Sequence, residues 1–289
     1  MNEKKIYALG FFDGVHLGHQ ALLTECCRLA EENGCKTAAL PFDLPPASVL
    51  KRQPADMLNT VSDRIALLKQ YGMERVTIWQ TNEKTLATSW EDFLAELLAQ
   101  GAAGFVCGED FRFGKKAAGN VELLKTLCEK HGVELRLVTP VVLDGAPISS
   151  TRIRGYIQQG NMALAWRMLG RPYSLRFPVV SGNKIGRTLN FPTINQIYPD
   201  HFAIPRFGVY VSVSEVDGEL YSSVTNVGVK PTVGSDRPLA ETYILGFSGN
   251  LYGTRIRVSL CHFIRPEMKF ASLEDLRQQI AKDTLQAGM

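Results

Sequence analysis

The stretch Lys5–Leu40, KIYALGFFDGVHLGHQALLTECCRLAEENGCKTAAL, decides the fold of the first part of the chain. It opens with Lys5–Leu9, a short apolar run containing β-forming residues, which predicts a strand. Apolar residues then recur at helical spacing over Ala21–Ala30, and Glu32-Asn33-Gly34 is a helix-ending signal. Because Thr37–Leu40 starts another strand, the stretch predicts a strand, a helix and a second strand in succession.

Two histidines, His16 and His19, lie between the first expected strand and the expected helix, at or just before the first turn of that helix. Residues three apart can share one helix face, and a helix N-terminus favours anions through its free N–H groups and dipole. Two imidazole donors there would suit a triphosphate whose charge grows during a reaction. A pair of surface histidines or a partial zinc site are the alternatives. Zinc normally takes a third and a fourth ligand, and the other histidines lie in unrelated settings, so phosphate is favoured.

Short apolar strands continue to alternate with helices up to about residue 172. The expected strands are 37–42, 75–79, 104–107 and 135–138, and the expected helices are 62–71, 90–99 and 118–132. Such alternation predicts a parallel sheet with helices on both faces, which binds ligands beyond the carboxyl ends of its strands. The segment after the first strand, with its two histidines, belongs to that edge.

From about Arg176 the pattern changes to β. The expected strands are 208–214, 220–224, 242–247 and 255–263, with Asp217-Gly218 as a two-residue hairpin turn. Ser272-Leu273-Glu274-Asp275 then resembles a capping box and predicts a final helix. We therefore expect an antiparallel barrel, closed or nearly closed, with a terminal helix. The boundary falls in Gly170–Ser174, which gives domains 1–172 and 173–289.

Composition is ordinary for a globular protein of 289 residues, long enough for two cores. The formal charge is +3, from 32 basic and 29 acidic residues, which is too balanced to indicate a nucleic acid or membrane partner. The start lacks a signal-peptide core, and no apolar run approaches membrane-spanning length. Six cysteines without a CxxC pair favour reduced thiols and a cytoplasmic location. The oligomeric state is left open.

Two further motifs follow strand ends or open helices. Gly108–Gly114, GEDFRFG, comes directly after an expected strand. Ile148–Arg154, ISSTRIR, opens a helix with hydroxyls and two arginines, which can form a phosphate clamp. The alternatives are a simple turn for the first motif and an N-cap with solvated arginines for the second.

Together with GFFDGVHLGH at 10–19, these motifs resemble the adenylyltransferase domain of the bifunctional riboflavin kinase/FAD synthetase family. The second half carries matching motifs in the family order: GNKIGRTLNFPTIN at 182–195, NVGVKPT at 226–232, LYG at 251–253 and RPEMKF at 265–270. The resemblance spans nearly the whole chain. It implies a Rossmann-like α/β nucleotidyltransferase domain followed by a β-barrel riboflavin kinase domain.

The resemblance implies two activities that share small-molecule substrates. The C-terminal domain would phosphorylate riboflavin to FMN with ATP and Mg²⁺, and the N-terminal domain would adenylylate FMN to FAD with release of pyrophosphate. It also implies the ATP and phosphate contacts of the adenylyltransferase: Gly10, Phe11, Phe12, Asp13, His16, His19, Ser149, Ser150, Thr151 and Arg154, with His16 and His19 catalytic. Asp110 and Phe111 would contact the flavin.

The kinase step needs a base near a ribityl hydroxyl whose pKa is far above neutral, and a carboxylate is the expected one. Glu241 begins the expected strand Glu241–Leu245, where the resemblance implies the family's catalytic glutamate; a surface carboxylate on a strand edge is the alternative. Thr193 and Asn195 point the same way on an extended segment and would suit Mg²⁺, unless they form only a turn and a cap. The implied ATP and flavin contacts of the kinase are Gly182, Lys184, Gly186, Arg187, Thr193, Asn195 and Glu241.

Four positions depart from the family pattern. Pro45 stands where the family has a histidine after the second strand, and the others are Ser181, Asn190 and Ile194 in or near the kinase phosphate loop. We expect FAD synthesis to be weakened but not abolished. One alternative is a riboflavin kinase with an impaired or regulatory N-terminal nucleotide-binding domain. The other, a cytidylyltransferase-like enzyme fused to an unrelated barrel, would leave Glu241 without a role.

Overall fold

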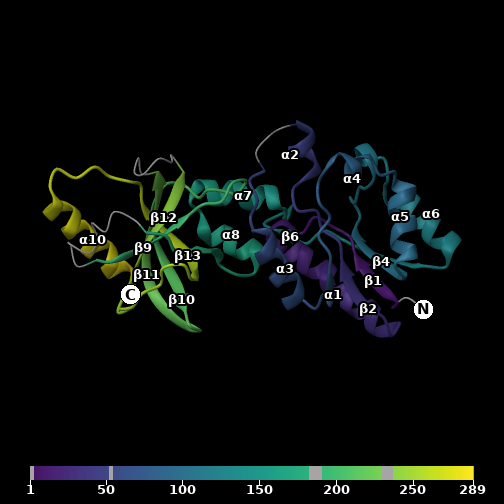
Figure 1. Ribbon diagram of the computed structural model, residues 1–289, viewed down its shortest axis with the longest axis horizontal. Helices are drawn as coiled ribbons and strands as arrows, with labels where there is room; N and C mark the ends of the chain where they lie inside the picture. The colour runs from purple at the N-terminus through teal and green to yellow at the C-terminus, as the bar shows by residue number, and fades with distance from the viewer. Residues whose placement is uncertain (1–2, 52–54, 182–190, 230–236, 289) are drawn as a thin grey trace. The chain divides into compact units, whose positions relative to one another are not determined.

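The computed structural model describes residues 3–51, 55–181, 191–229 and 237–288. It divides into two compact units, Met1–Ser150 and Thr151–Met289. The first is built from parallel strands and helices, and the second holds an antiparallel sheet with the terminal helix (Figure 1). The fold class predicted from the sequence is confirmed.

The first unit is organised around a five-stranded parallel sheet in the order β3-β2-β1-β4-β5. Its strands are β1 Lys5–Ala8, β2 Lys36–Ala39, β3 Arg75–Val76, β4 Ala102–Gly108 and β5 Glu134–Val138. The strand order changes direction at β1 and β4, because β2 and β3 lie on one side of β1 whereas β4 and β5 lie on the other. Ligands bind at such a switch point in open α/β sheets.

Two cores cover the two faces of this sheet because successive strand residues point to opposite sides. Ile6 and Ala8 of β1 pack in one core with α1, and Tyr7 packs in the other with α5 and α6. The helices of the unit are α1 Leu17–Glu32, α2 Pro46–Lys51, α3 Val61–Gln70, α4 Glu83–Ala87, α5 Trp90–Ala99 and α6 Val121–His131. The short elements, not expected from the sequence, are η1 Asp13–Val15, η2 Lys115–Ala117, β6 Val142–Leu143 and β7 Ala146–Pro147.

The expected helix 118–132 begins later than predicted. Asn120 accepts a hydrogen bond from the backbone N–H of Leu123, which makes it the N-cap and places the first helical residue at Val121. The residues before Asn120 are not helical in the same way, because Phe113 and Gly119 pair as an isolated antiparallel bridge. A cap bond therefore decides the boundary that apolar spacing alone placed too early.

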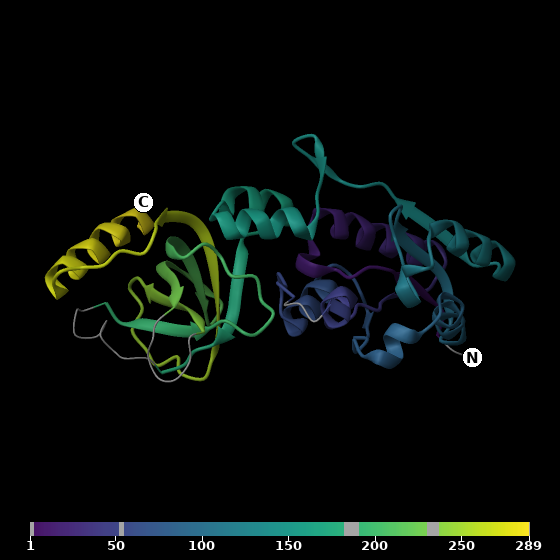
Figure 2. The ribbon, with the colours of Figure 1, turned by 90° about the horizontal axis from the view of Figure 1, so that it is seen from above.

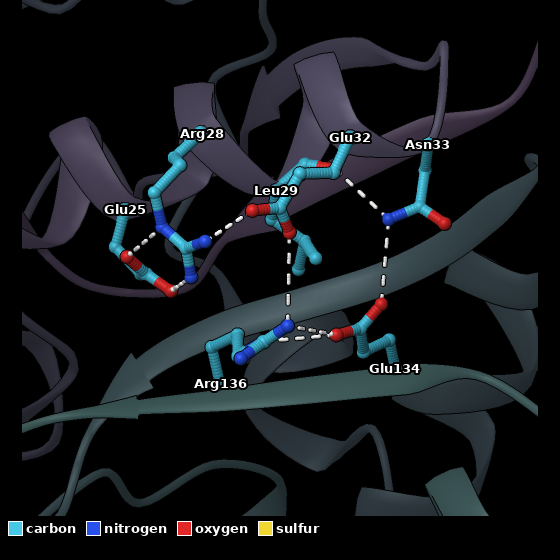
Figure 3. Close-up of polar contacts among 7 residues, drawn as sticks. All are labelled: Glu25, Arg28, Leu29, Glu32, Asn33, Glu134 and Arg136. Atoms are coloured by element: carbon cyan, nitrogen blue, oxygen red, sulfur yellow. Dashed lines mark hydrogen bonds and ion pairs between the residues drawn. The ribbon is translucent and has the colours of Figure 1, made fainter.

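A cluster of charged side chains joins the end of α1 to the edge strand β5 (Figure 3). Arg28 pairs with Glu25 at 2.6 Å and also with Glu32, and Arg136 pairs with Glu134 at 2.5 Å and with Glu32 at 3.7 Å. Four of the five side chains are at least 39% exposed and Glu25 is 24% exposed, so each pair contributes at most about 1 kcal/mol. The cluster orients the two elements without dominating their stability.

Helix α7, Ser150–Gln159, begins at the division between the two units. The second unit continues with α8 Met162–Leu169 and with six described antiparallel strands. These strands are β8 Tyr173–Pro178, β9 Thr193–Ile197, β10 Gly208–Val216, β11 Glu219–Val229, β12 Pro238–Ile244 and β13 Arg255–Arg265, in the order β8-β13-β10-β11-β12-β9. A bridge between Val180 and Asn195, with the Val180 N–H donating at 2.8 Å, joins the two edges of the sheet. The sheet thus curls on itself (Figure 2).

Local signals in the barrel are borne out in part. Asp217 and Gly218 have φ values of 51° and 86°, as a two-residue hairpin between β10 and β11 requires. Strand β12, however, starts at Pro238 and ends at Ile244, so Glu241 lies in the middle of the strand and Leu245 lies outside it. The prediction that Glu241 begins its strand was wrong, because β12 pairs on both sides and the pairing extends upstream to Pro238.

The terminal helix α10, Leu273–Ala287, is fixed to the barrel by one buried ion pair. Arg265 at the end of β13 binds Asp283 at 2.7 Å, and the Asp283 side chain is only 3% exposed. Ala287 packs against Val209 and Val224 of the sheet. Because Asp283 is buried, removing Arg265 alone would leave an uncompensated charge and loosen the helix.

Candidate active sites

His16 and His19 lie side by side at the N-terminus of α1. His16 is the N-cap residue, and its Nδ1 accepts a hydrogen bond from the backbone N–H of His19 at 3.3 Å. The two rings are stacked, with centroids 3.7 Å apart and planes 14° from parallel. Since Nδ1 of His16 is an acceptor, the neutral ring carries its proton on Nε2, which is then its donor. The helix end therefore presents imidazole and backbone donors together.

The turn that leads to these histidines is strained. Phe12, Gly14 and Val15 have φ values of 58°, 80° and 38°, all in the left-handed region. A β-branched residue such as Val15 rarely adopts such a conformation. Phe12 and Val15 are also fully buried in the core beside α1. Strain of this kind persists only where the surroundings hold it, and it concentrates at functional sites.

Hydrogen bonds from distant parts of the chain hold the turn. The Asp13 carboxylate accepts from the Leu58 N–H at 2.8 Å, and the Gly14 N–H donates to Asn59 Oδ1 at 2.6 Å. Ser150 Oγ donates to the Asp13 carbonyl at 2.9 Å. Asp13 is 1% exposed, so its carboxylate shapes the loop. We did not identify Leu58 or Asn59 from the sequence, because nothing local marks them.

Gly18 lies between the two histidines of the motif, and its lack of a side chain has a direct use. A Cβ at Gly18 would lie 3.2 Å from Cε1 and Nδ1 of the His16 ring. This is closer than most Cβ contacts in proteins, so with a side chain at this position the His16 ring would have to shift by a few tenths of an ångström. The glycine therefore permits the stacked arrangement of the two imidazoles.

The GEDFRFG motif lies beside this turn at the sheet edge. It follows β4, which pairs with β1 in parallel, so both loops leave the carboxyl edge at the switch point. Asp110 is exposed, and Phe111 is half-buried and stacked on Phe113 with centroids 5.4 Å apart. An exposed carboxylate beside a partly open aromatic face fits the flavin contacts predicted for this loop.

The ISSTRIR motif marks the start of α7. Ser149 precedes the helix and Ser150 is its first residue, both within the first unit. Thr151 and Arg154 belong to the residues that cluster with the second unit, and Arg154 Nη2 donates to Thr151 Oγ1 at 3.2 Å. The motif therefore lies at a helix N-terminus, as its hydroxyls predict.

The segment after β2 contains the departure at Pro45. Asp43 Oδ1 accepts from the backbone N–H groups of Leu44 at 2.8 Å and Thr81 at 2.7 Å. Burial alone would raise the pKa of Asp43, but these hydrogen bonds outweigh it and lower that pKa. Pro45 lies just before α2, which starts at Pro46. The segment keeps a carboxylate of fixed geometry but lacks the imidazole of the family pattern.

A row of polar residues crosses three strands of the second unit. Glu241 of β12 is in register with Asn195 of β9 on one side and with Asn226 of β11 on the other. Cross-strand partners point to the same face of a sheet, so the three side chains are neighbours. Thr193, two residues before Asn195, is on the same face. The structure thus brings Thr193, Asn195 and Glu241 together.

Glu267 extends this row from the RPEMKF motif. Asn226 Nδ2 donates to Glu267 Oε1 at 3.3 Å. A Cβ at Gly228 would overlap the Glu267 carboxylate, so the glycine makes room for it. The sequence marked both segments as motifs but gave Asn226 and Glu267 no role. The other predicted kinase residues, Gly182, Lys184, Gly186 and Arg187, lie outside the described residues, as does Asn190.

Three further features concern the described part of the chain. No group of three His, Cys, Asp or Glu side chains there could hold a metal ion. No helix among the described residues is long and apolar enough to cross a membrane. A cavity of about 290 Å³ opens near the β10–β11 hairpin, lined by residues that include Arg176, Glu215 and Arg257. None of the predicted site residues lines this cavity.

Comparison with known proteins identifies both halves of the chain. The family profile of FAD synthetase matches residues 1–152, and that of riboflavin kinase matches residues 169–288. The bifunctional riboflavin kinase/FMN adenylyltransferase of Bacillus subtilis is 35% identical over 98% of this chain and 92% of that protein. The corresponding Haemophilus influenzae protein is 36% identical over 95% of this chain and 90% of its own length.

A solved structure matches the fold over nearly the whole chain. It is described as a macrolide-efflux protein from Streptococcus pneumoniae and superposes with a TM-score of 0.87, at 30% identity, over 98% of this chain and 93% of that one. Its description applies to that protein, and the likeness concerns the arrangement of the chain. The fold and the two profiles define a two-part protein with an FAD synthetase half and a riboflavin kinase half. The chain belongs to the bifunctional riboflavin kinase/FMN adenylyltransferase family, as its motifs predicted.

Proposed function

We propose that this chain phosphorylates riboflavin to FMN with ATP and adenylylates FMN to FAD with a second ATP. The family assignment over both halves supports the two activities. The observation that carries the adenylyl transfer is the stacked pair His16 and His19 at a helix N-terminus, on the switch-point edge of a parallel sheet. Such an edge is where nucleotides bind in α/β folds.

In adenylyl transfer, an FMN phosphate oxygen attacks the α-phosphorus of ATP and pyrophosphate leaves. No protein nucleophile is needed, so the chain contributes positioning and charge stabilisation. His16 Nε2–H and His19 would donate to phosphate oxygens as negative charge develops. We assign the remaining ATP contacts to the loop and to the helix start of the ISSTRIR motif: Gly10, Phe11, Ser149, Ser150, Thr151 and Arg154. Phe12 and Asp13, which the resemblance also implied as contacts, are 0% and 1% exposed and would instead hold the loop in shape. Asp110 and Phe111 would contact FMN.

In the kinase reaction, Glu241 would accept the proton of the terminal ribityl hydroxyl. The hydroxyl oxygen then bonds to the γ-phosphorus of ATP, and ADP leaves. Thr193 and Asn195 offer neutral oxygens beside Glu241, a donor set that fits Mg²⁺ held largely by ATP phosphates and water. When bound, Mg²⁺ neutralises phosphate charge. By family resemblance, Gly182, Lys184, Gly186 and Arg187 would also contact ATP or flavin.

We further propose that residues 1–172 form the adenylyltransferase and 173–289 the kinase, and that the enzyme works in the cytoplasm. All six cysteines are free thiols, which agrees with a reducing compartment. ATP, riboflavin and FMN are the proposed small-molecule partners. No nucleic acid or membrane partner is proposed.

One observation favours a second candidate function. Pro45 replaces a histidine of the family pattern near the nucleotide site, which supports a riboflavin kinase whose N-terminal domain is impaired or regulatory. Incubating the purified chain with riboflavin, ATP and Mg²⁺ and separating the flavins distinguishes the candidates. FMN together with FAD supports the bifunctional enzyme, and FMN alone at high enzyme concentration supports the second candidate. If neither flavin forms, both proposals fail.

A further inference from the structure

Arg64 is a buried cation beneath the histidine turn. It lies in α3, has no solvent-exposed surface and is among the largest fully buried side chains of the described residues. Its Nη1 donates to the Phe11 carbonyl at 3.1 Å, and its Nη2 donates to the Asp43 carbonyl at 2.8 Å. The guanidinium carbon lies 4.8 Å from the centroid of the Phe11 ring. One side chain thus joins the loops that follow β1 and β2.

Burying this guanidinium is costly unless its surroundings compensate. Burial lowers the pKa of Arg64, while the negative charges of Asp13 and Asp43 oppose that change. Arginine remains protonated even so, because its guanidinium is not deprotonated in proteins. An apolar side chain such as Met would fill most of the same space without that desolvation. The hydrogen bonds of Arg64 therefore have a use that packing alone does not provide.

The carbonyl of Phe11, one of the two that accept hydrogen bonds from Arg64, indicates what these bonds do. The Phe11 carbonyl belongs to the peptide that enters Phe12, the first left-handed residue of the strained turn. Fixing that carbonyl fixes the orientation of the Phe11–Phe12 peptide plane. Four residues after Phe12 comes His16, whose ring caps α1 and stacks on His19. The position of the two imidazoles thus depends on a turn that Arg64 restrains through its hydrogen bond to the Phe11 carbonyl.

We propose that Arg64 is a positioning residue for adenylyl transfer, which holds the turn 11–15 so that His16 and His19 face the reacting phosphate. The inference rests on the proposed role of these histidines. It does not require Arg64 to touch the substrate. It adds a residue of α3 to a site otherwise assigned to the ends of β1 and β4 and to the start of α7.

The test compares Arg64→Met, Arg64→Lys and Arg75→Met in the full chain. Arg75→Met is the matched control, since Arg75 is exposed and pairs with Glu3 at 3.2 Å. For Arg64→Met we expect kcat for FAD formation from FMN and ATP to fall by about 10²-fold, the size of effect that a small misplacement of catalytic groups produces. The KM for ATP should change much less. Arg64→Lys should lose less, because it keeps one donor.

Riboflavin phosphorylation by the same molecules reports the amount of folded kinase half and should stay at the wild-type rate in every variant. Thermal melting of each variant, with assays run well below the first transition, removes the contribution of unfolding. If Arg64→Met does not fold, Arg64→Lys alone decides. A wild-type kcat for adenylylation in the folded Arg64 variants would overturn the proposal.

A double mutant separates positioning from general stability. If Arg64 acts through the histidines, Arg64→Met combined with His19→Ala should be little slower than His19→Ala alone, because coupled residues are not additive. Losses that multiply would overturn the proposed mechanism of Arg64. Failure of the underlying function looks different, since His19→Ala by itself would then leave adenylylation unchanged.

Discussion

Asn226 and Glu241 lie directly opposite each other on strands β11 and β12, and the Asn226 amide also reaches the Glu267 carboxylate at 3.3 Å. The carboxylates of Glu241 and Glu267 therefore both lie near the Asn226 side-chain amide. Only Glu241 has Asn195 of the proposed magnesium pair as its other cross-strand partner. This asymmetry supports the base role proposed for Glu241, while Glu267 contacts the Asn226 side chain.

Replacing Glu241 by Gln should slow FMN formation sharply. Losing a positioned general base typically costs about 10²–10⁴-fold in rate. Adenylylation of added FMN should stay nearly intact, because Glu241 is not among the residues assigned to that reaction. The measurement is the initial rate of each step with saturating ATP. Unchanged riboflavin phosphorylation would remove Glu241 from the mechanism.

Gly228→Ala should displace Glu267, because the added Cβ would overlap its carboxylate. We expect a lower rate of riboflavin phosphorylation, by roughly tenfold if one hydrogen bond to a charged group is lost. Gly155→Ala is the control, since a Cβ there meets nothing within 4 Å. If the Gly228 variant keeps the wild-type kinase rate, the contact between Asn226 and Glu267 has no part in catalysis.

His19→Ala should reduce adenylylation well below the level of the wild-type chain, which we expect to be weakened already by Pro45. Loss of one donor aimed at the reacting phosphate costs on the order of 10²-fold. Pyrophosphate release from ATP in the presence of FMN and Mg²⁺ measures the reaction. Equal release by the mutant and the wild type would show that the histidines of this turn do not bind the phosphates.

Three buried thiols should make the first unit less stable in alkali. Burial raises the pKa of Cys26 and of Cys107 to about 12 and that of Cys128 to about 11, from an ordinary value of 9.0. Between about pH 9 and 12 the unfolded chain therefore binds fewer protons than the folded one, so stability falls as pH rises through this window. The stability contributed by the three protonated thiols is fully present below pH 9. Melting curves at pH 8 and pH 10 measure the fall.

Cys107→Ala isolates the contribution of one thiol from that of other groups that titrate in alkali. The variant should lose less stability between pH 8 and pH 10 than the wild type, by up to about 1.4 kcal/mol per pH unit. An identical pH dependence in both proteins would show that Cys107 ionises as easily in the folded state as in the unfolded chain.

A fragment of residues 173–289 should phosphorylate riboflavin without forming FAD. It contains the six described strands of the barrel, α10 and every residue assigned to the kinase. A fragment of residues 151–289, which adds α7 and α8, is the matched comparison because it follows the division into compact units. If 173–289 folds but shows no kinase activity while 151–289 is active, the two helices belong to the kinase and the boundary lies near residue 150.

The sequence by itself determined the features that depend on neighbours along the chain. Apolar periodicity placed β1, α1 and β2 within a residue or two for most boundaries, because each element buries a face of its own. Asp217-Gly218 specified its hairpin, since few residues tolerate positive φ. The motifs identified the family because their residue types and order recur as local strings.

Only the tertiary structure decided which distant residues complete the sites. Arg64 reaches Phe11 across 53 residues, and Asn59 reaches Gly14 across 45. In the sequence, Arg64 is one polar residue at the start of an amphipathic helix, and only the packing of α3 buries it beneath the turn. Glu241 lies in mid-strand because β9 and β11 pair on both sides of it. Burial and pairing depend on partners that no local window of sequence contains.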